Sequence, residues 1–244
     1  CDALTKLDIP NTVTNIGTGA FYECGGFTDI AVPNSVKNLG SRAFENCDAL
    51  AKVSISDSVT SMGEKAFYDC DALTDVELGT GITQIPTSCF EHCDALPSVV
   101  LPYRVSKVGD NAFKNCVALI EITIPRATTS ISSSVFSYPA KMTVYGISGT
   151  YAETFANQQG MKFVDKAVKA TNVVLDKTEL TLNRGMKYSL TMTVTPATFT
   201  DEVAWKSTNV NVAAIAEDGT VTAKEAGQAT IKVTVGDVSA NCKV

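Results

Sequence analysis

Six of the eight cysteines recur at a fixed interval of 23 residues, and regularly spaced thiols could form disulfides or bind a metal ion: Cys1, Cys24, Cys47, Cys70, Cys93 and Cys116. A tetrahedral metal site needs ligands that converge on one point, whereas one thiol per repeat forms a straight line. Parallel side chains on neighbouring repeats also hold their Cβ atoms too far apart for easy disulfide closure. We therefore expect these thiols to be free and packed as small apolar groups. Cys89 and Cys93, four residues apart, are the first candidates for an exception.

Catalytic chemistry has little support in the sequence. His92 is the only histidine and falls in the turn before Cys93, with no motif that ties a nucleophile to it. The chain has no nucleophile elbow, phosphate-binding loop or zinc-binding helix. The acidic residues that follow the cysteine column are expected to cap backbone N–H groups rather than bind metal: Asp2, Asp48, Asp71 and Asp94. We expect no catalytic residue, no metal site and no cofactor.

A group of cations around one aromatic residue is the best candidate contact surface. Tyr103, Arg104, Lys107 and Arg126 fall in the fifth and sixth repeats of an otherwise acidic region. Tyr103 and Arg126 take the same position in successive repeats, so we expect them about 4.8 Å apart. Tyr and Arg gain most from partial desolvation, which is typical of a binding hot spot. In the alternative interpretation, Arg126 only stacks on Tyr103 and both shield the end of the core.

These side chains must be positioned by a repeat of 23 residues. Its second marker is a column of aromatic residues: Phe21, Phe44, Phe67, Phe90, Phe113 and Phe136. Six such units fill residues 1–138. In each, apolar residues alternate as in a strand that often ends at proline, a second short strand follows, and a glycine precedes a short helical turn that carries Ala and Phe inward. Units of this size bury their apolar faces only by stacking, so we predict a curved right-handed solenoid with two narrow columns of parallel strands.

The outward residues of the two strand columns have a pattern of their own. The first column reads Lys6, Asp29, Lys52, Asp75, Ser98 and Glu121. Alternating charges on adjacent parallel strands predict modestly stabilising ion pairs. The second column is mostly Thr and Ser, which suits an exposed strand and could also meet glycans.

Residues 139–165 break the repeat and are expected to cap the solenoid. Lys141 to Tyr145 can supply a further strand, and Met161 to Val164 a closing one. Thr150 and Glu153 form a capping-box pattern that predicts a helix over 151–159, which Gly160 ends. Tyr151 and Phe155 fall on one face of this helix.

From residue 170 the pattern becomes all-β, after a linker predicted near Lys166 to Lys169. Alternation predicts strands over 188–195, 229–235 and 238–244, and a further strand over 203–206 that carries Trp205, the only tryptophan. Asp218 and Gly219 predict a hairpin. Short strands over about 80 residues are typical of a β-sandwich over 170–244.

Both regions resemble known families. The segments C-x-x-L-x-x-I-x-I-P and I-G-x-x-A-F over residues 1–138 resemble BspA-like leucine-rich repeats of bacterial surface proteins. The pattern departs at Ser56, Gly79, Pro86, Cys89, Ser132 and Val135, which affects local loop shape. Residues 170–244, with VVLDKTELTLNRG, the VTP segment, Trp205 and DGTVTAKEAGQATIKV, resemble group 2 bacterial immunoglobulin-like domains. The resemblance implies a mainly β chain: a leucine-rich-repeat solenoid over 1–165 with its cap, then an immunoglobulin-like β-sandwich.

Charge and family resemblance together limit the function. Residues 1–165 hold 11 Lys and Arg against 18 Asp and Glu, a net charge of −7, which argues against nucleic-acid binding. No apolar run is long enough for membrane insertion. The register suggests a piece of a longer precursor, and it explains Cys1 without a lipoprotein anchor. The resemblance implies an extracellular protein, on the bacterial surface or secreted. We expect a non-enzymatic, monomeric module that adheres to a protein or glycan ligand; the alternatives are an accessory region of a surface enzyme and a structural stalk.

Overall fold

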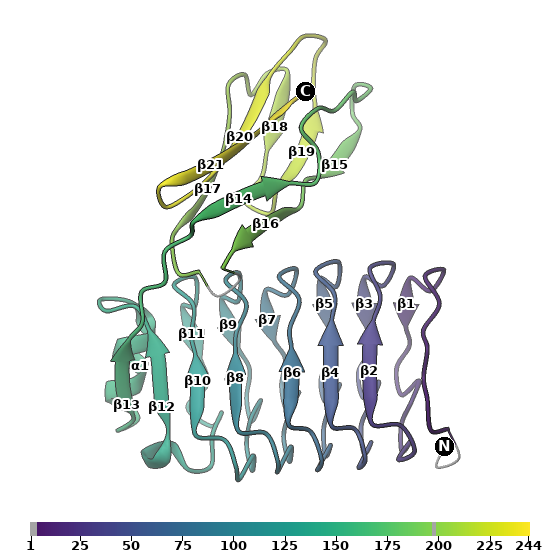
Figure 1. Cartoon of the computed structure of the whole chain (residues 1–244), viewed down its shortest axis with the longest axis vertical. Coiled ribbons are helices and arrows are strands. Elements are labelled where there is room, and N and C mark those ends of the chain that lie inside the picture. The colour runs from purple at the N-terminus through teal and green to yellow at the C-terminus, as the bar shows by residue number, and fades with distance from the viewer. Residues whose placement is uncertain (1–3, 197–198) are drawn as a thin grey trace. The chain divides into compact units, whose positions relative to one another are not determined.

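A computed structural model describes residues 4–196 and 199–244 of the chain (Figure 1). The chain divides into two compact units, residues 1–166 and 167–244. None of the helices in the described residues is long and apolar enough to cross a membrane. We call each 23-residue repeat a rung and number the rungs from the N-terminus, so that rung 4 is 70–92 and rung 5 is 93–115.

The first unit is a stack of rungs whose first strands form one face. The strands of the rungs are β2 (Asp29–Val32), β4 (Lys52–Ile55), β6 (Asp75–Glu77), β8 (Ser98–Val100) and β10 (Glu121–Thr123). The strands β12 (Thr143–Gly146) and β13 (Lys162–Asp165) of the cap extend the same column. They pair in parallel, with equivalent positions of successive rungs in register, as Ile30 pairs with Val53. The predicted solenoid of parallel strands is confirmed.

The second strands of the rungs form another face and are shorter. They are β1 (Asn15–Ile16), β3 (Asn38–Leu39), β5 (Ser61–Met62), β7 (Gln84–Ile85), β9 (Lys107–Val108) and β11 (Ser130–Ile131). One residue of each is buried and the other is exposed, because only two residues fit between the turn and the next bend.

Neither strand column is continuous, because two prolines remove donors from the ladders. Within the described chain, the first column is interrupted between β6 and β8, and the second between β5 and β7. At the position of Pro97, Thr74 in the preceding rung donates its N–H to the carbonyl of Ala51 at 2.9 Å. At the position of Pro86, Gly63 donates its N–H to the carbonyl of Leu39 at 2.8 Å. Proline has no N–H, so each of these rung contacts lacks at least the hydrogen bond that this position makes elsewhere in the stack.

The segment that carries Phe inward is a pair of tight turns, so the predicted helical turn is wrong. In rung 2, Arg42 and Asn46 both have a φ of +59°, and the same two positions are left-handed in the neighbouring rungs. The N–H groups of Arg42, Phe44 and Asn46 donate to carbonyls of the next rung at 2.8–2.9 Å instead of to their own turn. A third ladder therefore runs along the stack, and it continues past both proline interruptions.

The core of the first unit is the predicted stack of phenylalanine rings. Consecutive rings from Phe21 to Phe113 lie 5.2–5.4 Å apart between centroids and within 8° of parallel. Phe113 and Phe136 are 6.1 Å apart and tilted by 20°. Leucines at the fourth position of the rungs, such as Leu50 and Leu73, are fully buried beside the stack.

The cap closes this core as expected, with one local difference. It contains a 3-10 turn η1 (Pro139–Lys141), strand β12, helix α1 (Tyr151–Gln158) and strand β13, which pairs with β12 in parallel. Tyr151 and Phe155 stack at 6.1 Å on one face of α1, and Phe155 lies 6.4 Å from Phe136. The capping box does not form. The Thr150 hydroxyl donates to the carbonyl of Ile147, and Glu153 accepts from the N–H of Gly149.

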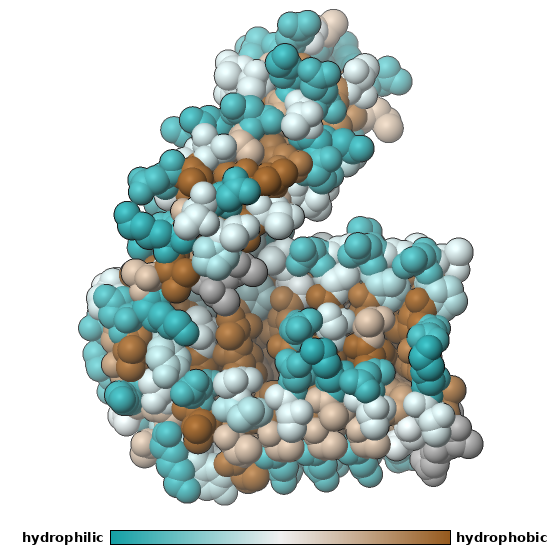
Figure 2. Space-filling view, in the orientation of Figure 1, coloured by the Kyte–Doolittle hydropathy of each residue, from teal (hydrophilic) through white to brown (hydrophobic). Residues whose placement is uncertain are grey.

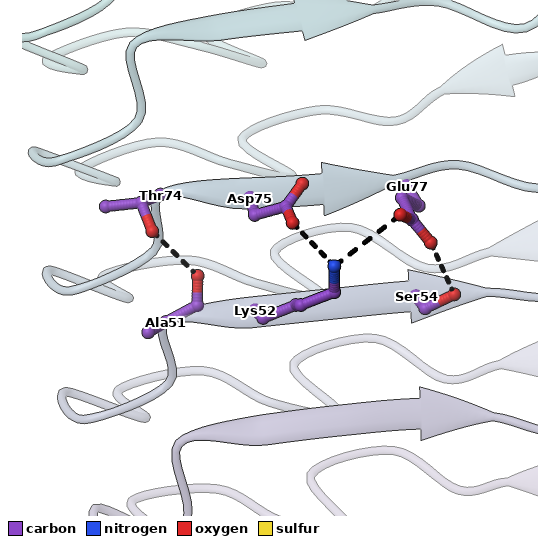
Figure 3. Close-up of polar contacts among 6 residues, drawn as sticks. All are labelled: Ala51, Lys52, Ser54, Thr74, Asp75 and Glu77. Atoms are coloured by element: carbon purple, nitrogen blue, oxygen red, sulfur yellow. Dashed lines mark hydrogen bonds and ion pairs between the residues drawn. The ribbon is translucent and has the colours of Figure 1, made fainter.

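The alternating charges of the first strand column form fewer ion pairs than predicted (Figure 3). The Lys52 ammonium lies 2.7 Å from Asp75 and 3.5 Å from Glu77 on the next strand. Lys6 instead pairs with Asp8 of its own rung, and Asp29 accepts a hydrogen bond from the Thr28 hydroxyl. Hydrophilic side chains gather over β4 and β6 on this face (Figure 2). Alternating charge on neighbouring strands therefore gives an ion pair between rungs only where the charged side chain has no polar partner in its own rung.

The described part of the second unit contains eight strands around a separate core. They are β14 (Asn172–Leu175), β15 (Lys187–Ser189), β16 (Met192–Thr195), β17 (Val203–Ser207), β18 (Ala213–Ile215), β19 (Thr220–Ala223), β20 (Thr230–Val235) and β21 (Val238–Lys243). They pair in antiparallel groups, in the orders β14-β16, β15-β19-β18 and β17-β20-β21. The hairpin at Gly219 and the strand that carries Trp205 are confirmed.

One predicted strand of the second unit is divided in two. The alternating run from Tyr188 to Val194 forms two strands. Its first part, β15, pairs with β19, and its second part, β16, pairs with β14. The change occurs at Leu190 and Thr191. The N–H of Leu190 donates to the carbonyl of Gly219, while the N–H of Thr191 donates to the Asp176 carboxylate at 2.9 Å. Continuous alternation therefore does not reveal that a chain changes its pairing partner midway.

Candidate functional site

The thiols of the solenoid are buried hydrogen-bond donors, not nucleophiles. The described cysteines of the repeats are free, as predicted: Cys24, Cys47, Cys70, Cys89, Cys93 and Cys116. Cys242 of the second unit is also free, and Cys1 lies outside the described residues. Burial raises the pKa of Cys47 to about 11, and it raises the pKa of Cys70 and Cys93 as well. A thiol held in its protonated form inside the core cannot serve as an attacking thiolate.

His92 takes part in a polar chain along the edge of the rungs. Its Nε2 atom is 3.1 Å from the side-chain amide nitrogen of Asn115, and its ring meets the edge of Tyr68 at 5.6 Å between centroids. The Ser137 hydroxyl donates to the Asn115 amide oxygen at 2.7 Å. His92 therefore links neighbouring rungs through the amide of Asn115, and in this chain the Ser137 hydroxyl bonds to that amide rather than to the imidazole.

The aspartates that follow the cysteine column were expected to cap backbone N–H groups. Asp2 lies outside the described residues. Asp94 has a buried carboxylate oxygen, Oδ1, for which no hydrogen-bond partner is present. Burial, together with the nearby charges of Asp69 and Asp94, raises the pKa of Asp71. Within residues 4–196 and 199–244, no three His, Cys, Asp or Glu side chains are grouped so that they could hold a metal ion.

The predicted contact group is distributed over two kinds of element. Tyr103 and Arg104 lie in the turn between β8 and β9, Arg126 in the turn between β10 and β11, and Lys107 on β9 itself. Lys107 and Arg126 are exposed, but Tyr103 and Arg104 are half-buried. The tyrosine of the predicted contact group is therefore not a fully exposed side chain. Burial is the main cause that raises the pKa of Tyr103 to about 12; Asp57 adds to the rise and Arg104 opposes it.

A groove of about 570 Å³ lies over the second strand column in rungs 2–6. Its lining is polar along the sides, with apolar and small residues between: Ser41, Met62, Gly63, Glu64, Gln84, Ile85, Pro86, Thr87, Lys107, Val108, Gly109, Asp110, Ser130 and Ser132. Its volume is within the range of pockets that bind small ligands. Lys107 is the only member of the predicted contact group among these lining residues.

Sequence reasoning missed most of this groove. Glu64 and Asp110 occupy one column of the repeat, and Gln84 occupies another. Both columns hold mixed polar residues, so none of the three marks a site by its type. The available signal was Pro86, which stands where four other rungs have glycine. That substitution marks the interrupted sheet beneath the groove.

Family models match both units. Residues 1–116 match the BspA type leucine rich repeat region in six copies. Residues 169–244 match the bacterial Ig-like domain, group 2. A comparison with curated proteins found no match.

Several solved structures are similar to part of the chain. A leucine rich cell surface protein from Faecalibacterium prausnitzii A2-165 is 26% identical, over 60% of this chain and 54% of that one, with a TM-score of 0.43. The leucine rich repeat protein of T. pallidum is 23% identical, over 62% and 79%, with a TM-score of 0.47. The pneumococcal vaccine antigen PcpA is 17% identical, over 63% and 45%, with a TM-score of 0.48. The match therefore spans about half the length of the first and third proteins.

Proposed function

Because the chain joins BspA-type leucine-rich repeats to a group 2 bacterial immunoglobulin-like domain, we propose that it is a non-enzymatic binding protein outside the bacterial cell. In this proposal the solenoid supplies the adhesive surface, on the cell surface or in secreted form. The immunoglobulin-like unit spaces or presents it. The ligand is a protein or a glycan of the host or its matrix.

The observation that carries this proposal is that the backbone, the apolar side chains and the polar side chains of each rung have separate roles. Backbone groups of the strands and turns bond to neighbouring rungs, as when Phe44 donates to the carbonyl of Ala66 at 2.8 Å. Apolar side chains fill the interior. What remains are exposed columns of polar side chains, which repeat along a rigid scaffold and offer a broad surface to a partner.

The same packing supports the non-enzymatic part of the proposal. The thiols face the core, and the only histidine is engaged by Asn115. A nucleophile and a base within hydrogen-bond reach of each other, open to a substrate, are the minimum for most hydrolytic chemistry. The described residues of the solenoid offer His92 no such partner.

Binding to immobilised host-matrix proteins, mucins and glycans tests this function. We expect saturable binding of the whole chain to at least one probe. The double variant Tyr103→Ala, Arg126→Ala then asks whether the predicted contact group takes part, with the melting temperature as the check on folding. Binding to none of the probes would instead favour a structural stalk or an accessory region of a larger enzyme.

A further inference from the structure

At the groove over the second strand column, one backbone carbonyl lacks the hydrogen bond that its equivalents in other rungs accept. The carbonyls of Ile16, Leu39, Ile85 and Val108 each accept a hydrogen bond from the next rung at 2.8–3.1 Å. Met62 holds the equivalent position, but the next residue in line is Pro86, which has no N–H. Met62 and Pro86 both line the groove. The rung contact that would have used this carbonyl is therefore missing at the groove.

The side chains around this acceptor combine both signs of charge with uncharged polar groups. Lys107 and Gln84 lie on paired strands in register, and Ser130 follows Lys107 on the next strand. Glu64 and Asp110, which lie beyond the strands, are exposed and add carboxylates. Among the described residues, none of these three charged groups forms a salt bridge within the protein. Their hydrogen-bonding capacity is thus available to a ligand.

We infer that this groove binds a neutral oligosaccharide through Lys107, Gln84 and the two flanking carboxylates. The inference rests on the proposed binding function and assigns it a site and a ligand class. A sugar hydroxyl both donates and accepts, so one ring can satisfy an ammonium, an amide, a carboxylate and a backbone carbonyl together. Mixed charges that nearly cancel suit an uncharged ligand better than an anionic one.

A protein ligand fits the same groove less well. Protein hot spots are usually aromatic or apolar anchors seated in desolvated pockets. In the described part of the chain this groove has no aromatic lining residue, and its apolar members, such as Ile85 and Val108, are already buried in the core. Its polar lining instead changes from strand to strand, with Gln84, Lys107 and Ser130 at one position of paired strands about 4.8 Å apart. A row of different donors and acceptors at that spacing suits the several hydroxyl groups of successive sugar units.

The test begins with an array of neutral oligosaccharides and of extended peptides, probed with the whole chain. The strongest oligosaccharide is then titrated by calorimetry against Lys107→Ala, Gln84→Ala and Pro86→Gly. We expect each alanine variant to weaken binding about three- to tenfold, because each removes one hydrogen-bond partner. Pro86→Gly restores an N–H for the Met62 carbonyl and should weaken binding by a similar factor. Lys37→Ala is the matched control, since it removes an exposed lysine of the same sheet face outside the groove.

The outcomes separate this inference from the proposed function. Binding to an oligosaccharide that Lys107→Ala and Gln84→Ala weaken, and Lys37→Ala does not, supports the groove. Oligosaccharide binding that all variants retain would overturn the groove and leave the binding function standing. Binding to peptides or host proteins, without binding to any oligosaccharide, would likewise overturn the groove and leave the binding function standing. Circular dichroism and the melting temperature of each variant show whether a loss of binding is only a loss of fold.

Discussion

The Sγ atom of Cys93 donates a hydrogen bond to the backbone carbonyl of Phe67, 26 residues earlier in the chain, at 3.2 Å. The same bond recurs through the stack, from Cys47 to Phe21, from Cys70 to Phe44 and from Cys116 to Phe90, at 2.9–3.2 Å. The thiol column thus gives a donor to a buried carbonyl in each rung while it fills the space beside the phenylalanine rings.

Replacing this thiol should separate its two roles. Cys93→Ala leaves the Phe67 carbonyl without its donor and removes a buried sulfur, so we expect a loss of about 1–3 kcal/mol in the free energy of unfolding. Cys93→Ser keeps a donor and should lose less. Urea unfolding of the two variants measures the difference. If alanine is no worse than serine, the thiol hydrogen bond has no energetic role.

The 23-residue pattern was sufficient to predict the stacked core but not the hydrogen bonds between rungs. A Phe or Leu at the same position of every rung predicts a buried side chain, because equivalent residues of stacked repeats face the same interior. The role of Cys93 as a donor could not be predicted, because free cysteine is usually read as a small apolar residue. The left-handed turns were missed because Arg42 and Lys65 share a column in which only Gly19 and Asn111 have the residue types that favour a positive φ.

The interruptions of the two sheets could have been predicted in part. Pro86 and Pro97 each occupy a position whose N–H bonds to the preceding rung elsewhere in the stack. This position can be recognised only once the pairing register is known. The repeat also contains prolines that end strands without removing a hydrogen bond between rungs. The half-buried state of Tyr103 could not be predicted for a different reason. The repeat locates Tyr103 within its rung, but the burial of its ring depends on how the turn folds.

Alkaline pH should destabilise the solenoid through the same thiols. Burial raises the pKa of Cys47 from its ordinary value of 9.0 to about 11. The unfolded chain therefore releases this proton above about pH 9, whereas the folded chain keeps it until about pH 11. The stabilising contribution is complete below pH 9 and is lost as pH rises towards 11. Urea unfolding across this range should show falling stability, and Cys47→Ser should flatten the decline; an equal decline in the variant would assign it to other groups.

The glycine column should tolerate substitution in one rung and not in the next. A Cβ atom on Gly40 would lie 2.5 Å from backbone atoms of Gly17 and Thr18 in the preceding rung, whereas one on Gly17 meets nothing within 4 Å. We expect Gly40→Ala to cost about 2 kcal/mol or more, because the backbone of the rung below cannot move aside. Gly17→Ala is the matched control. It should be neutral or stabilising by about 0.5 kcal/mol, through the reduced freedom of the unfolded chain. Thermal unfolding compares the two, and equal losses would mean that rung contact is not the cause.

Restoring a donor at the interrupted second sheet should rebuild the missing rung contact. In Pro86→Gly the new N–H faces the carbonyl of Met62, in the arrangement by which Gly63 reaches Leu39 and Gly109 reaches Ile85 at 2.8 Å. The gained hydrogen bond, about 1 kcal/mol, is offset by the greater freedom of glycine in the unfolded chain, so the melting temperature should change little. Hydrogen exchange gives the decisive reading. The amide of the introduced glycine should be protected to the same degree as those of Gly63 and Gly109, because all three would then lie in one continuous ladder. Rapid exchange of that amide in a folded variant would show that the missing N–H donor of Pro86 is not the only reason why β5 and β7 are unpaired.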